Sequence, residues 1–205
     1  MNATDAERND AYRAVGRYVV EFSRMVFHMR FNLERQADSE GDALVASLLL
    51  GRASAQEVRR AFFAVCRSKG NLSSSETKIA DRLESGVERE LKWRNKFAHG
   101  DWWVGFGQKK DGSGGDPMLG RPGTLNRGPE MQELPASTID EISDRLYALR
   151  QQLGEFGDIC LGTWPFQHKL DRTVRVADIF SINGTTIVRD GPLARAVGIG
   201  TIQYS

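Results

Sequence analysis

The residues from about Asp5 to Arg35 carry the longest regular pattern in the chain. Apolar side chains recur there at intervals of three and four, with no proline between them: Tyr12, Val15, Val19, Phe22, Val26, Met29 and Leu33. This spacing is typical of one side of an α-helix. We therefore expect one long amphipathic helix over this range.

Two shorter helices are expected next. An apolar run over residues 43–50 is followed by Gly51, a residue that suits the position after a helix C-terminus. The next helix should cover residues 54–69, because Ser54 is followed three residues later by Glu57, the spacing of a capping box.

Two further helices follow from the same signals. Ser73 precedes Glu76 by three residues, and the apolar periodicity behind them continues to His99. After a gap, helical periodicity returns over residues 137–161. The expected fold is mainly α, an antiparallel helical bundle.

The composition changes between the last two helices and again after them. Residues 105–128 contain eight glycines and two prolines, which indicates a long mobile loop or an irregular hairpin. Beyond Pro165, β-branched runs cover 173–176 and 179–188, and the second run contains Asn183-Gly184, the strongest short hairpin signal. We expect a helical domain over 1–163 and a β-rich extension over 164–205 that packs on the helical body or on a partner.

Composition excludes several classes of function. The 205 residues contain 28 Lys+Arg and 27 Asp+Glu, so any nucleic-acid contact must come from a local basic patch. Two cysteines and three histidines without ligand spacing argue against a zinc site and a disulfide scaffold. No apolar run reaches membrane-spanning length, and the first residues lack an apolar signal core. We expect a cytoplasmic protein with no membrane partner.

The end of the fourth expected helix carries the sharpest chemical signal. On an ideal helix, Arg94 falls near the centre of the arc that holds Leu83, Val87 and Leu91, and Glu90 lies inside this arc too. Charges normally lie opposite an apolar stripe, so these two require an interface, a cleft or a buried ion pair.

The segment Arg94-Asn95-Lys96-Phe97-Ala98-His99 resembles the R-N-x-x-x-H signature of the HEPN superfamily, named for higher eukaryotes and prokaryotes nucleotide-binding. The continuation Gly100-Asp101-Trp102 is similar to the Ala-His-Gly-x-Trp sequence of many bacterial members.

This resemblance implies an up-down helical bundle that forms a homodimer, with the paired motif helices lining a cleft. In catalytic members that cleft is a metal-independent endoribonuclease site, so no cofactor is implied. It assigns catalysis to Arg94, Asn95 and His99, with Glu90 holding Arg94 in place. Possible RNA contacts come from Lys96, Trp102 and Trp103. The expected context is a toxin or an RNA-targeting phage defence component, with an antitoxin or a nucleotidyltransferase as a possible partner.

The residue types agree with this chemistry. Attack by the ribose 2′-OH needs proton transfer, which suits histidine, and a cation on the phosphate, which suits arginine. Arg94 and His99 lie about 140° apart on an ideal helix, so a dimer cleft to which both copies contribute is the expected arrangement.

Two other interpretations stay open. In the first, the chain is a non-catalytic helical interaction module, in which Glu90 and Arg94 form a buried ion pair that sets specificity and His99 only caps the helix. In the second, the extension over 164–205 carries the specific function by docking a partner through strand addition.

Overall fold

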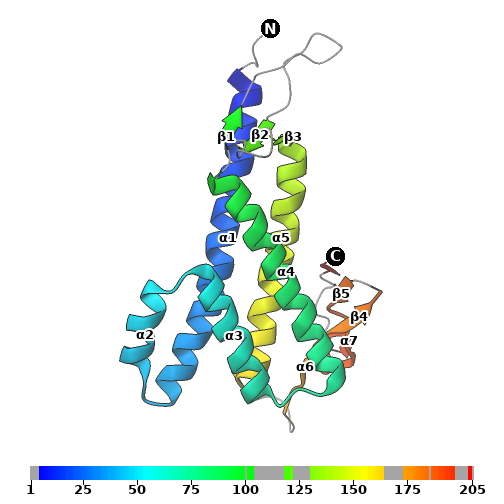
Figure 1. Cartoon of the computed structure of the whole chain (residues 1–205). Helices are drawn as coiled ribbons and strands as arrows, with labels where there is room; N and C mark the ends of the chain where they lie inside the picture. The colour runs from blue at the N-terminus through cyan, green and yellow to red at the C-terminus, as the bar shows by residue number, and fades with distance from the viewer. Residues whose placement is uncertain are drawn as a thin grey trace. The chain divides into compact units, whose positions relative to one another are not determined.

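The computed structural model describes residues 5–99, 101–103, 118–121, 130–163, 173–184, 186–196 and 203–204. The elements, in chain order, are α1 (Asp5–Ser39), α2 (Ala43–Arg52), α3 (Ala55–Gly70), α4 (Ser74–His99), β1 (Asp101–Trp103), β2 (Met118–Arg121), β3 (Glu130–Glu133), α5 (Ala136–Cys160), α6 (Val176–Ile179), β4 (Ser181–Asn183), β5 (Thr186–Val188), α7 (Pro192–Ala196) and β6 (Gln203–Tyr204) (Figure 1). The expectation of a mainly α protein is confirmed, whereas an antiparallel HEPN-like bundle stays a prediction.

The chain divides into two compact units. The first contains Met1–Phe22 and Glu90–Leu146, and the second contains Ser23–Arg89 and Tyr147–Ser205. Helices α1, α4 and α5 contribute residues to both units. This division does not follow the expected boundary after residue 163, because the C-terminal elements belong to the same unit as α3.

The first unit contains a small antiparallel sheet in the order β1-β2-β3. Trp102 pairs with Leu119, which in turn pairs with Gln132. Trp102 and Trp103 therefore lie in a strand. Strand β2 lies within the glycine-rich range expected to be a loop or irregular hairpin, and the rest of 105–128 lies outside the described residues.

The buried face of α1 differs from the expected one. The side chains that α1 buries are Ala11, Ala14, Tyr18, Phe22, Met25, Met29 and Leu33, while Tyr12 and Val19 are exposed. Helix α1 has apolar residues on two sides, and small residues at positions 11 and 14 allow close packing on one of them. Periodicity alone could not choose between the two sides.

Capping fixes where α3 and α4 begin. Ser54 and Glu57 form the expected capping box, with the Ser54 amide donating to Glu57 Oε2 at 2.7 Å. The Ser73 amide donates in the same way to Glu76 Oε2 at 2.9 Å, and the Glu76 amide donates to Ser73 Oγ. Both capping predictions are confirmed.

Helix α2 continues one residue beyond the glycine that was expected to end it. Gly51 lies inside α2, and the capping residue is Ala53, whose amide donates to the Leu50 carbonyl at 3.2 Å. The expected stop at Gly51 was wrong because a right-handed helix accepts glycine without strain.

The C-terminal segment forms the expected hairpin but not the first expected strand. Asn183 pairs with Thr186, so Gly184, with φ 58°, begins a two-residue turn between β4 and β5. Residues 173–175 form no strand, and Val176, the last residue of the first expected run, begins the short helix α6, because the Asp178 carboxylate accepts from the Arg175 amide and starts a helical turn. Tertiary and capping contacts override the β preference of valine.

This segment packs on helices of its own unit. Arg82 of α4 donates to the Gly184 carbonyl at 2.6 Å, and Gln152 of α5 donates to the Ile187 carbonyl at 3.2 Å. Of the two expected packing partners, the helical body and another molecule, the structure shows the helical body. Within the described residues, no helix has the length and apolar character needed to cross a membrane.

Candidate functional site at the end of α4

An aromatic cluster anchors the last turns of α4 in the first unit. The rings of Trp93 and Phe97 stack with centroids 5.7 Å apart, and the Phe97 ring lies 4.4 Å from that of Tyr18 on α1. The Tyr18 hydroxyl donates to the Glu90 carbonyl at 2.8 Å. These contacts hold the backbone of the motif against α1.

Glu90 is fully buried, but it does not pair with Arg94 as expected. Its carboxylate accepts from Arg145 Nε of α5 at 3.3 Å. The prediction that Glu90 holds the Arg94 guanidinium was wrong. The reason is geometric: Glu90 points into the core, where α5 presents a cation, whereas Arg94 lies one turn farther along, where its side chain is exposed.

The three residues assigned to catalysis are all exposed. Arg94 Nη1 donates to Asn95 Oδ1 at 3.2 Å, which joins two of them directly. His99 is the last residue of α4. The structure therefore brings Arg94 and Asn95 together and places His99 about 7.5 Å farther along the helix axis.

Part of the exposed surface at the end of α4 continues a face that is buried nearer the start of this helix. Val87 and Leu91 are buried, yet Arg94 and Ala98, each seven residues later on the same face, are exposed. The sequence places Arg94 on a face that requires an interface, a cleft or a buried ion pair. Among the described residues no second helix covers Arg94, so an interface requires another molecule.

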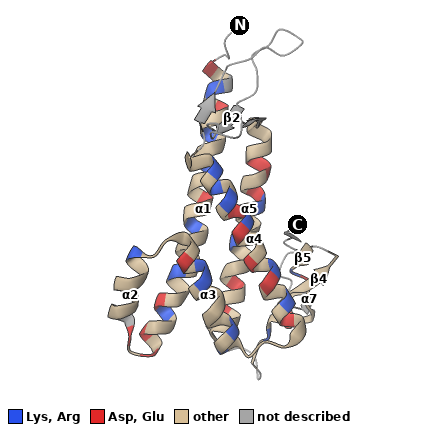
Figure 2. Ribbon diagram, viewed as in Figure 1, with Lys and Arg blue, Asp and Glu red and all other residues tan. Residues whose placement is uncertain are grey.

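The end of α4 is locally basic. Residues 91–99 include Lys92, Arg94 and Lys96 and no acidic residue (Figure 2). Lys96 Nζ lies 4.6 Å from the centre of the Trp93 ring, in a cation–π contact. This is the local patch that a chain of net charge +1 needs in order to attract a polyanion.

The other predicted RNA contacts lie in β1. Trp102 and Trp103 follow α4 closely and form strand pairs with β2. Their side chains lie outside the described part of the structure, so their contact with RNA stays a prediction.

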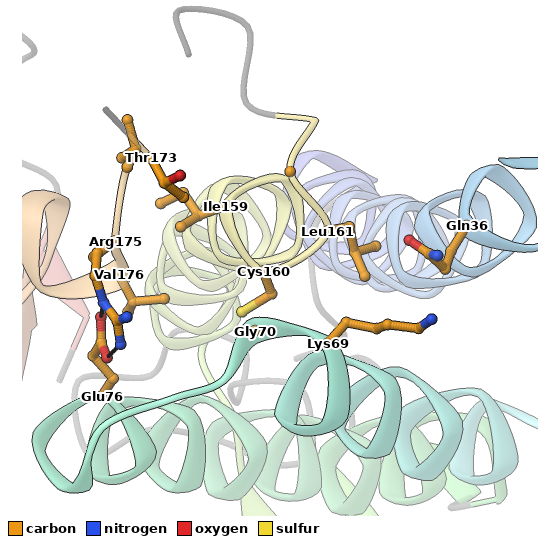
Figure 3. Close-up of a pocket in the computed structure, with 12 residues that line it drawn as sticks. Gln36, Lys69, Gly70, Glu76, Ile159, Cys160, Leu161, Thr173, Arg175 and Val176 are labelled. Atoms are coloured by element: carbon orange, nitrogen blue, oxygen red, sulfur yellow. Dashed lines mark hydrogen bonds and ion pairs between the residues drawn. The ribbon is translucent and has the colours of Figure 1, made fainter. Parts of the chain in front are cut away.

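A pocket of about 340 Å³ lies in the second unit, at the C-terminal ends of α3 and α5. Figure 3 shows Glu76 and Arg175 on one side of it and Gln36 and Lys69 on the other. Sequence reasoning missed this pocket, because it combines segments more than one hundred residues apart. None of the motif residues lines it.

Glu76 is the most strongly perturbed group at this pocket. Burial raises the pKa of its carboxyl, but hydrogen bonds from Arg175, Ser73 and the Ala177 amide outweigh burial and lower it to about 2. Glu76 is therefore a charged structural anchor that joins the start of α4 to α6.

In the described ranges, no three His, Cys, Asp or Glu side chains lie close enough together to hold a metal ion. The expected absence of a metal stays a prediction. Comparison of the chain with protein-family models, curated proteins and solved structures gives no match.

Proposed function

We propose that the chain is a metal-independent endoribonuclease of HEPN type that acts as a homodimer through the exposed end of α4. The observation that carries this proposal is the exposure of Arg94, Asn95 and His99 together on a basic helix end. Its biological setting would be a toxin or an RNA-targeting defence component, with an antitoxin or a nucleotidyltransferase as partner.

The proposed reaction needs only protein groups. His99 accepts the proton of a ribose 2′-OH, the 2′ oxygen forms a bond to the adjacent phosphorus, and the bond from phosphorus to the 5′ oxygen breaks. The proton then passes to that leaving oxygen. Arg94 binds the phosphate oxygens through its two-pronged guanidinium, and Asn95, which already accepts from Arg94, orients it.

The uncovered face supports the dimer. Arg94 and Ala98 continue a face that α4 buries farther back, and a second copy could cover this face as the helix body covers Val87 and Leu91. In such a pair, Arg94 of one copy approaches the His99 of the other, which removes the need for one helix to present both residues on the same side.

Cleavage of a chimeric oligonucleotide tests the proposal. The probe is DNA with a single ribonucleotide, incubated with the protein in EDTA. We expect cleavage only at the ribonucleotide, with loss of at least about 100-fold for Arg94→Ala and His99→Ala. Lys78→Ala, at an exposed basic position of α4 far from the motif, is the matched control and should retain most activity. Cleavage by His99→Ala near the wild-type rate would overturn the assignment.

A second candidate is a non-catalytic helical interaction module. The observation that favours it is that Arg94 donates to its neighbour Asn95, and no contact among the described residues orients Arg94 toward His99. No cleavage and no RNA binding, together with a stable complex with a protein partner that Arg94→Ala disrupts, would favour this module.

A further inference from the structure

Helix α2 exposes an apolar face that nothing in the described structure covers. We define the α2 apolar face as Leu44, Val45, Leu48 and Leu49, whose exposed fractions range from 56% for Val45 to 74% for Leu44. The half-buried positions of α2 are Ala46 and Leu50, four residues apart on the opposite side. The helix therefore packs through the side that carries Ala46 and Leu50 and leaves Leu44, Leu48 and Leu49 in solvent.

The neighbouring part of α1 is also apolar. Arg30 donates to the Ala53 carbonyl at 3.2 Å, which holds the end of α2 beside this part of α1. Phe27 and Phe31 of α1 stack with their ring centroids 6.0 Å apart, and they are 60% and 44% exposed. Single exposed apolar residues are ordinary, but two exposed apolar groups on helices joined by the Arg30–Ala53 hydrogen bond mark an interaction surface.

We infer that the α2 apolar face pairs with the same face of a second copy of this chain, with the two α2 helices antiparallel. Charge supports a second copy as the occupant. Helix α2 has no charged residue between Asp42 at its start and Arg52 at its end (Figure 2). A two-fold axis across the helix centre places Asp42 of each copy beside Arg52 of the other.

Both charged residues are available for this pairing. Asp42 occupies the N-cap position of α2 but makes no side-chain capping hydrogen bond, and both Asp42 and Arg52 are exposed. A membrane surface fits less well, because helices that lie on membranes carry several Lys or Arg on their polar side.

The area is sufficient for a stable dimer. The α2 apolar face together with Phe27 and Phe31 offers roughly 450 Å² of apolar surface per copy. Since apolar atoms supply about two-thirds of a homodimer interface, this corresponds to about 1,400 Å² over two copies, within the range of about 1,200–2,000 Å² of stable interfaces.

Engineered cross-linking tests the pairing. Leu48 lies near the middle of α2, so Leu48→Cys should give a covalent dimer under mild oxidation. Ser47→Cys, exposed on the same helix but outside the α2 apolar face, should cross-link much less. The native Cys66 and Cys160 are both buried and do not interfere. Equal or absent cross-linking at the two positions would overturn the inference.

Solution mass gives an independent measurement. Leu48→Glu should lower the mass found by light scattering, and Ser47→Glu should leave it unchanged. Asp42→Arg and Arg52→Asp should each weaken association roughly fivefold, and the double variant should restore it. An unchanged mass for Leu48→Glu would overturn the pairing. The pairing would also be overturned if the wild type bound phosphatidylglycerol vesicles and Leu48→Glu lost that binding without a change in mass. None of these readouts uses RNA, so they can fail independently of the proposed nuclease.

Discussion

The buried carboxylate of Glu90 is paired with Arg145 at 3.3 Å, although Arg94 lies only one helical turn away on the same helix. This pair joins α4 to α5 within the first unit, while Arg94 is left in solvent beside Asn95. The buried carboxylate therefore takes its cation from another helix, and Arg94, the candidate functional residue, stays outside the core.

Removal of Arg145 should destabilise the protein far more than removal of Arg94. Arg145→Ala leaves the Glu90 carboxylate buried without this cation, and the cost should be about 3 kcal/mol. Arg94→Ala changes an exposed side chain and should alter the free energy of unfolding by no more than about 0.5 kcal/mol. Urea unfolding monitored by circular dichroism measures both, and equal effects would contradict the assignment of the ion pair.

Stability should fall in acid through Glu76. The pKa of this carboxyl is about 2 in the folded chain against 4.5 as its ordinary value, so its charged form stabilises the fold above about pH 4.5. This contribution, at most about 3 kcal/mol, is lost as the pH falls from 4.5 through 2. The difference in unfolding free energy between wild type and Glu76→Gln should therefore shrink between pH 7 and pH 3. A constant difference would show that the charge of Glu76 is not what stabilises this contact.

Local sequence signals predicted the helices but could not identify their long-range partners. Ser54 and Glu57 are three residues apart, so their capping box is visible in the sequence. Arg145 lies 55 residues from Glu90, and the helical pattern offered the nearer Arg94 instead. The expected ion pair was wrong for this reason.

The same limit applies to the C-terminal segment and to α1. The β-branched residues near Val176 favour a strand, but the Asp178 carboxylate and packing produce α6. In α1, both sides carry apolar residues, and only the packing partners decide that Tyr18 is buried and Tyr12 exposed. Exposure of Arg94 and His99 likewise depends on how far neighbouring elements extend along α4, which no local pattern encodes.

Two glycine-to-alanine changes in helices should have opposite effects. A Cβ at Gly157 would lie 2.6 Å from Asn32 Nδ2 and 3.0 Å from Phe62 Cε2, both in buried side chains, so Gly157→Ala should cost about 1–3 kcal/mol. A Cβ at Gly16 meets nothing within 4 Å, so Gly16→Ala should stabilise the protein by about 0.5–1 kcal/mol. Thermal unfolding measures both, and a rise in Tm for Gly157→Ala would contradict the close packing of α5.

The two cysteines should react at different rates. Contact with the Cys160 thiol and burial both raise the pKa of Cys66, which disfavours the reactive thiolate. Cys160 borders the pocket, whereas Cys66 is fully buried. In single-thiol proteins the contact between the two thiols is absent and burial alone acts, so Cys66 in Cys160→Ser should react with a disulfide reagent at least about tenfold more slowly than Cys160 in Cys66→Ser. Equal rates in the native state, with fast labelling of both after unfolding, would contradict the burial of Cys66.

Mixing two inactive variants should restore RNA cleavage if each proposed site combines Arg94 of one copy with His99 of the other. In a mixed dimer of Arg94→Ala and His99→Ala, one of the two sites has lost both residues and the other retains both. Random exchange makes about half of the dimers mixed, so about one quarter of the wild-type activity should return. The measurement is cleavage of the chimeric oligonucleotide in EDTA after the variants are mixed and allowed to exchange subunits, with each variant alone as control. If mixing restores nothing although exchange is shown by labelled subunits, Arg94 and His99 do not act across a dimer interface.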